Sequence, residues 1–200
     1  MSQMSFFDPS AFGLENLDFV QEGVAVSVIV AAGGHIDGRI RLQKLVFLLD
    51  KLGLNSGFSF TYHHYGPFSS DLAGAVDTAK AFGLIHEKFK HREIDGVRYS
   101  SFSLGNRLES GAAAGFLSNT RIRGAVDAMK VATSTVLELA ATAYWLKHDE
   151  RREDWRMEIV RRKGQKTEQS RLEIALKLLT AIGLALESSQ EPSPILRQLP

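Results

Sequence analysis

Residues 39–85 constrain the fold of this chain most, because they combine two helix patterns with an aromatic segment between them. In residues 39–52, apolar side chains recur at the spacing of one helix face, and Gly53 follows as a typical helix stop. In residues 69–82 a second apolar stripe begins after serines that can cap a helix, and it ends at Gly83. The two stripes are Leu42, Leu45, Val46, Leu49 and Leu52, and Leu72, Val76, Ala79 and Phe82.

The segment between these helices predicts a short strand and a tight turn. Aromatic residues at 58, 60 and 62 alternate with Ser59 and Thr61, which is the period of a strand. Pro67 is then expected to end any regular element, and Ser69 or Ser70 to cap the next helix. We therefore expect the aromatic residues to be held close to the start of the second helix.

Residues 85–104 predict a β-hairpin. Asp95-Gly96 is a strong two-residue turn signal. Val97 lies on one face of the second strand, whereas Phe102 has the opposite parity, so a bulge near Ser100 and Ser101 is expected to reconcile them. The hairpin follows the second helix directly.

The rest of the chain is mainly helical in pattern. Residues 22–32 fit a helix or a buried strand, and their length and the Gly33-Gly34 stop favour the helix. Residues 121–147 predict one long helix, and residues 106–119 a weak helix or a linker. Ser170 with Glu173 predicts a capping box before the final stripe, which consists of Leu172, Ala175, Leu179 and Ile182.

Helix, helix, helix, hairpin is the order of a winged helix. We therefore predict a mainly α fold with a winged-helix-like core and a small β-hairpin, plus a C-terminal helical bundle. The expected organisation is a flexible N-terminal arm at 1–18, the core at 19–110, C-terminal helices packing on the core at 111–187, and a tail at 188–200.

Composition excludes several classes of protein. The 200 residues carry a net charge of +1, so no global field attracts nucleic acid, and the chain has no cysteine for disulfides or thiolate metal sites. The longest apolar run, residues 24–32, is far shorter than the roughly 20 residues that span a bilayer. The N-terminus lacks the pattern of a secretion signal. A cytoplasmic protein with no membrane contact is expected.

Three short motifs carry a family resemblance. They are LQKLVF at 42–47, YGPFS at 65–69, and the helix from Asp71-Leu72 to its exit at Gly83-Leu84-Ile85. Together they resemble the Panacea, or SocA-like, antitoxin domain, and especially its YwgA-like branch. The resemblance covers residues 36–105, with a fainter similarity at 160–184. The N-terminal arm and the long C-terminal bundle depart from the family pattern.

The resemblance implies a small intracellular protein that neutralises a partner toxin by binding it, in a bacterial toxin–antitoxin, mobile-element or phage-defence context. One member of the class serves as a proteolysis adaptor. A protein partner, no cofactor and no enzymatic activity are therefore expected, and a homo-oligomer stays open. An adaptor without activity of its own is one alternative function.

The aromatic segment and the first motif helix supply the candidate partner site. Aromatic residues provide large contact area and are enriched at interface hot spots. In an extended segment Tyr62 and His64 would share one face and His63 and Tyr65 the other, so at least one face should reach the surface. The candidate residues are Lys44, Tyr62, His64, Tyr65, Gly66, Pro67 and Phe68.

The same residues also allow a purely structural interpretation, which the sequence favours. Gly66 can supply an unusual backbone angle, Pro67 can fix the entry to the next helix, and Tyr65 can pack beneath the turn. Lys44 can lay its stem along the core edge and keep its ammonium in water.

Metal and hydrolytic chemistry have no clear signature. Adjacent His63 and His64 would point to opposite faces of an extended segment and could not easily share one ion. The chain contains no Glu-x-Lys triplet, no phosphate loop, no nucleophile elbow and no dinucleotide fingerprint. We expect no catalytic and no metal-binding residues.

DNA binding is the other alternative, as a winged-helix transcriptional regulator. The helix that would read bases, residues 69–80, carries two aspartates and one lysine, which opposes phosphate attraction. The hairpin predicted at 85–104, which would be the wing, offers basic residues as possible nucleic-acid contacts, although Glu87, Glu93 and Asp95 nearly cancel the charge of those residues. Those contacts are Lys88, Lys90, Arg92 and Arg98.

Overall fold

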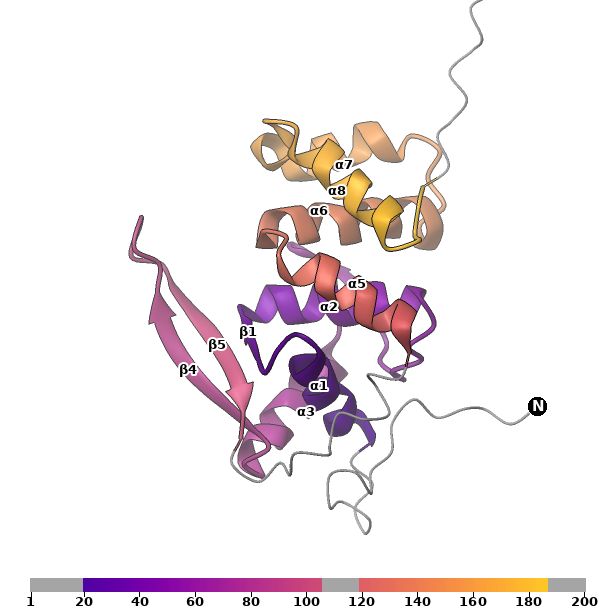
Figure 1. The fold of residues 1–200 in the computed structure, drawn as a ribbon. Coiled ribbons are helices and arrows are strands. Elements are labelled where there is room, and N and C mark those ends of the chain that lie inside the picture. The colour runs from indigo at the N-terminus through magenta and orange to yellow at the C-terminus, as the bar shows by residue number, and fades with distance from the viewer. Residues whose placement is uncertain (1–19, 106–118, 187–200) are drawn as a thin grey trace, which may run out of the picture.

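The computed structural model describes residues 20–105 and 119–186 (Figure 1). The predicted arm at 1–18 and tail at 188–200 lie outside the described residues. So do residues 106–118, where a weak helix or a linker is expected.

The N-terminal half has the order of a winged helix. Three of its strands form an antiparallel sheet in which β5 lies between β1 and β4. The amphipathic periods of residues 39–52 and 69–82 do form helices, and the ambiguous segment at 22–32 is helical as predicted. The elements are α1 (Val20–Ala31), β1 (His35–Asp37), α2 (Arg39–Lys51), α3 (Ser70–Ala81), β4 (Ile85–His91) and β5 (Arg98–Leu104).

A second, smaller hairpin is inserted between α2 and α3. It consists of β2 (Thr61–His63) and β3 (Gly66–Phe68), which pair antiparallel. The expectation that Pro67 ends regular structure is wrong, because Pro67 lies within β3, opposite Tyr62. A two-stranded hairpin has only edge strands, and an edge strand tolerates proline because the missing N–H need not face a partner.

The β4–β5 hairpin is regular and contains no bulge, so that prediction is also wrong. Its pairing runs without interruption from Ile85 opposite Leu104 to His91 opposite Arg98. The apolar residues of the second strand change from one face to the other because the hairpin leaves the body of the molecule toward its tip (Figure 1). Phe102 is buried near the base, whereas Val97 is exposed near the tip.

The C-terminal half is helical but more broken than predicted. The single helix expected at 121–147 is interrupted, because the Thr133 side chain accepts a hydrogen bond from the Val136 N–H and starts a new helix. The elements are α5 (Thr120–Lys130), α6 (Ser134–Tyr144), a π-helical turn (Trp145–Asp149), α7 (Trp155–Lys163), a 3-10 turn (Gly164–Thr167) and α8 (Arg171–Ala181).

The start of α8 differs from the predicted capping box. Ser170 is left-handed, with φ 57°, and its side chain makes no capping hydrogen bond. A capping hydroxyl normally belongs to a residue with an extended backbone, and Ser170 does not have that conformation. The Ser170–Glu173 pattern alone therefore did not predict how α8 begins. The final apolar stripe is nevertheless correct, since all four of its members are buried.

Helix α2 lies at the centre of the molecule. Eight consecutive residues, 42–49, are buried, because α6 and α5 of the C-terminal half pack on the helix opposite the N-terminal elements. A helix buried on all sides places even its polar side chains in the interior. Within the described ranges, no helix is both long enough and apolar enough to cross a membrane.

Candidate functional site

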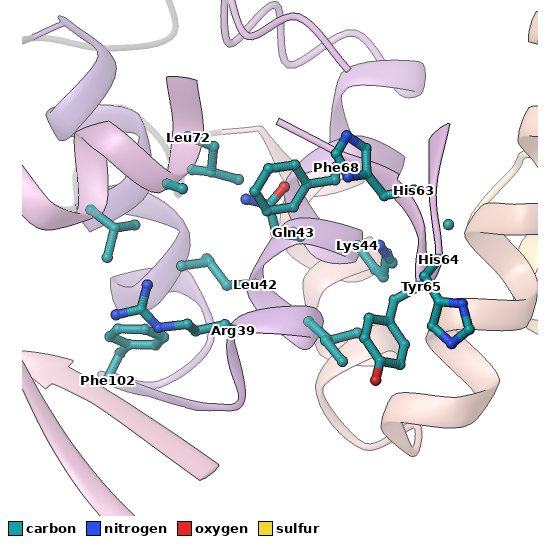
Figure 2. A pocket seen from close by; sticks show the side chains of 14 residues that line it. Arg39, Leu42, Gln43, Lys44, His63, His64, Tyr65, Phe68, Leu72 and Phe102 are labelled. Carbon is teal, nitrogen blue, oxygen red and sulfur yellow. The ribbon is translucent and has the colours of Figure 1, made fainter. Parts of the chain in front are cut away.

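An apolar groove of about 340 Å³ lies beside the aromatic hairpin (Figure 2). Helices α2 and α3 form its base, Phe68 lines one wall, and Tyr65 and Phe102 stand at its two ends. This volume is at the lower end of the range of ligand pockets. The lining residues are Arg39, Ile40, Leu42, Gln43, Lys44, His63, His64, Tyr65, Gly66, Phe68, Leu72, Ala73, Val76 and Phe102.

Gln43 fixes the point where the hairpin meets α3. Its buried amide donates to the Ser69 carbonyl at 2.9 Å and accepts from the Ser69 N–H at 2.8 Å. The Ser69 hydroxyl in turn accepts from the Leu72 N–H, which confirms Ser69 as the helix cap. The Gln43 side chain therefore makes the two backbone hydrogen bonds to Ser69 that a neighbouring strand would otherwise make.

Lys44 holds the other side of the same segment. Its side chain is only 2% exposed, and Nζ donates to the Pro67 carbonyl at 2.5 Å. The structural interpretation that placed its ammonium in water is wrong, because the C-terminal helices cover this side of α2. Burial lowers the pKa of Lys44 to about 8, although the carboxylate of Glu138 opposes that shift.

Gly66 is required for two reasons. Its φ of +83° is strained for any other residue, and a Cβ there would lie 2.7 Å from Thr142 Oγ1 of α6. Both Gly66 and Pro67 are buried. Together with Lys44 they hold the hairpin. Lys44 and Gly66 also line the groove, whereas Pro67 does not, and their contact with a partner stays a prediction.

A charged cluster from the C-terminal half holds the hairpin turn. The buried Glu138 accepts from Lys163 Nζ at 2.9 Å and from Lys166 Nζ at 2.9 Å. Lys163 also donates to the His64 carbonyl at 2.8 Å. Sequence reasoning missed these three residues, although Glu138 is the one charged residue in the apolar run 134–146 and was a usable signal.

The aromatic candidates do not form two alternating strand faces. Strand β2 ends at His63, and His64 and Tyr65 form the turn. Tyr62 is half-buried between Trp145 and the Arg162 guanidinium, which lies 4.6 Å from the ring centroid. Tyr65 is 47% exposed, with Lys166 Nζ 4.9 Å from its ring centroid.

The accessible members of the predicted partner site are therefore few. His64 and Tyr65 are exposed, and Phe68 is half-buried with its ring 5.0 Å from that of His63. All of them line the groove (Figure 2). Their contact with a partner stays a prediction.

The basic residues of the wing do not form one row. Lys88 lies opposite Ser101 and Lys90 opposite Tyr99 on one face of the hairpin, whereas Arg98 lies on the other face. Arg98 covers the Phe89 ring at 3.7 Å, Lys90 contacts Asp37 at 3.4 Å, and Arg92 pairs with Asp95. Helix α3 exposes Asp71 and Asp77.

Among the described residues, no three His, Asp or Glu side chains are grouped so that they could hold a metal ion. The fold and the groove define a mainly α protein with a winged-helix-like core, a small antiparallel sheet and an apolar groove against its inserted hairpin.

Comparison with known proteins finds a relative. The chain is 26% identical to the Uncharacterized protein YwgA of Bacillus subtilis (strain 168) over 138 residues, which is 67% of this chain and 81% of that protein. No family model matches the chain. A YwgA-like relationship is thus supported by sequence, and the name of that relative assigns no activity.

Proposed function

We propose that this chain is a non-enzymatic protein-binding module of the cytoplasm, an antitoxin-like regulator whose groove receives an apolar segment of a partner protein. The resemblance of its motifs to the Panacea, or SocA-like, domain motivates the regulatory role. The observation that carries the binding site is the apolar groove of about 340 Å³ between α2, α3 and the inserted hairpin.

The groove is suited to binding because its walls are already ordered. Gln43 and Lys44 bind the backbone of Ser69 and Pro67, and Lys163 binds that of His64. A wall held in place loses little conformational freedom when a partner docks, and this lowers the free-energy cost of association. The half-exposed ring of Tyr65 adds the kind of side chain that dominates interface hot spots.

Sequence-specific DNA binding is less well supported. The exposed Asp71 and Asp77 lie on α3, which is the helix that would approach a groove of DNA in a winged helix. Among the basic side chains of the wing, Lys88 and Lys90 lie on one face of the hairpin and Arg98 on the other. A protein partner therefore fits the surface of this chain better than a phosphate backbone does.

The test uses two arginine variants on the same helix. Ala73→Arg places a long cation in the groove, whereas Ala81→Arg places the same side chain on an exposed position of α3 outside it. The wild type and both variants are co-expressed with the product of the neighbouring gene. Growth of the cells and co-purification of the two proteins are measured, with melting temperatures as the check on folding.

We expect the wild type and Ala81→Arg to restore growth and to co-purify with the neighbour, and Ala73→Arg to do neither. Full capture by a folded Ala73→Arg variant would move the interface away from the groove. Absence of both capture and growth protection in the wild type would contradict the antitoxin-like role.

A further inference from the structure

The two ends of the groove, marked by Phe102 and Tyr65 in Figure 2, differ in charge balance. At the Phe102 end, two cations meet two carboxylates. Arg39 lies 2.9 Å from Glu87 and 3.8 Å from Asp77, and Lys80 contacts the same two groups at 2.6 and 2.9 Å. At the Tyr65 end, three ammonium groups share one carboxylate, since Lys44, Lys163 and Lys166 all face Glu138. The Tyr65 end therefore carries more positive than negative charge.

The positive excess is not relieved inside the protein. Lys163 and Lys166 take up the carboxylate of Glu138, so Lys44 is left with a neutral carbonyl, that of Pro67, as its hydrogen-bond acceptor. Uncompensated charge in a partly desolvated site costs free energy, and a further negative group nearby would recover it. Below its pKa of about 8, which burial has lowered, Lys44 stays mainly protonated and adds to the excess.

Lys166 is the member of this cluster that a partner can reach. Its side chain is 40% exposed, against 2% for Lys163. The ammonium lies against the ring of Tyr65, which is itself half-exposed in the groove wall, and the exposed His64 adjoins it in the chain. An anionic group beside Tyr65 would thus meet a cation that is already positioned.

We propose, resting on the proposed function, that the docking segment of the partner protein is apolar and acidic, with an Asp or Glu side chain placed at the Lys166 end. The apolar residues of this segment would sit on Ile40, Phe68 and Ala73, the partly exposed apolar residues that line the groove. A nucleic-acid phosphate is the weaker fit, because the groove walls are mainly apolar and α3 exposes Asp71 and Asp77.

The experiment begins with a displayed library of random dodecapeptides, selected on the immobilised full-length chain. Three variants are selected in parallel. Ala73→Arg blocks the groove. Lys166→Gln removes the charge but keeps a donor for Glu138. Lys177→Gln makes the same change on an exposed lysine of α8 that does not line the groove. Melting temperatures check that each variant is folded.

We expect the wild type and Lys177→Gln to enrich peptides that combine aromatic or aliphatic residues with Asp or Glu. Lys166→Gln should enrich apolar peptides without the acidic preference, and Ala73→Arg should enrich neither. A wild-type peptide is then resynthesised with its Asp or Glu changed to Asn or Gln. It should bind the wild type about fivefold more weakly, and bind Lys166→Gln with unchanged affinity.

Added salt provides a second measurement that does not depend on the variant. Binding of the acidic peptide to the wild type should weaken as salt rises, and binding of the amide peptide should not. Equal salt dependence of the two peptides would overturn the proposed acidic contact.

The other outcomes separate the two proposals. Groove-dependent enrichment of apolar peptides without Asp or Glu would overturn the acidic contact and leave the groove as the binding site. No enrichment on the wild type, or equal enrichment on Ala73→Arg, would overturn the groove itself. Groove-dependent binding of short DNA or RNA oligonucleotides in place of peptides would overturn the proposal in favour of a phosphate ligand.

Discussion

The two hairpins of this protein are stabilised in opposite ways. The β2–β3 hairpin has strands of three residues, but side chains from α2, α7 and the 3-10 turn hold it in place. The β4–β5 hairpin has strands of seven residues in regular pairing, but its outer half projects from the body, and Ile94 at its tip is 88% exposed. Contacts from residues distant in the sequence, and not strand length, therefore decide which hairpin is held against the body of the protein.

Removing the tether of the short hairpin should have the largest effect. Glu138→Ala leaves Lys163 buried without its carboxylate, and we expect a loss of about 3–5 kcal/mol in the free energy of unfolding. Urea denaturation measures this loss. Glu173→Ala, at an exposed position of α8, is the matched control and should change stability by less than about 0.5 kcal/mol. Similar stabilities for the two variants would mean that the cluster does not hold the hairpin.

The second comparison uses two glycines with similar backbones. Gly66 has φ +83° and Gly57 has φ +76°, so valine is strained at both. Only at Gly66 would the added Cβ meet another atom, Thr142 Oγ1 at 2.7 Å. We expect Gly66→Val to be less stable than Gly57→Val by about 1–3 kcal/mol. Equal melting temperatures for the two variants would count against a tightly packed turn.

The buried Lys44 predicts a dependence of stability on pH. Its pKa is about 8 in the folded chain and 10.5 in the unfolded chain, so between these values the unfolded chain binds more protons. The free energy of unfolding should therefore rise with pH from about 8 to about 10.5, by at most about 1.4 kcal/mol per pH unit.

Lys44→Met is the control for this slope. Glu138, Lys163 and Lys166 face Lys44 and are present in both proteins, so the difference between the two curves isolates the one amine. Denaturation midpoints measured across this range should diverge with pH. Parallel curves would show that Lys44 does not lose its proton in the folded state.

Changes at the tip of the long hairpin should have the smallest effect. Arg92 pairs with Asp95 across the turn, and both side chains are well exposed. Exposed ion pairs contribute little, so we expect Arg92→Ala to change the free energy of unfolding by no more than about 0.5 kcal/mol. A loss above about 1 kcal/mol would show that this tip contacts the body of the protein.

The sequence predicted the elements that depend on local pattern. The apolar periods of α2 and α3 and the Asp95-Gly96 signal were sufficient to place two helices, a hairpin and the winged-helix order. The predicted two-residue turn is wrong, because His91 pairs with Arg98 and residues 92–97 join the strands. The break at Thr133, the uncapped Ser170 and the strand position of Pro67 were not predicted, because several local conformations fit those residues and tertiary packing selects among them.

The candidate site was predicted in part for the same reason. The aromatic content of the hairpin pointed to His64, Tyr65 and Phe68, which do line the groove. The buried state of Lys44 and the role of Lys163 were not accessible, because the C-terminal half that creates them is distant in sequence. Lys163 and His64, for example, are 99 positions apart.

The lysine side chains that hold the short hairpin bind backbone carbonyls. The contacts that fix the hairpin can therefore stay constant during evolution while its exposed side chains change. Lys44 binds the carbonyl of Pro67 and Lys163 that of His64, and every residue type offers such a carbonyl. The exposed side chain at position 64 can therefore be exchanged by mutation without loss of the hydrogen bond made at the same position. A lineage of such proteins could diversify its surface at this turn, and so change partners, while the hairpin keeps its place.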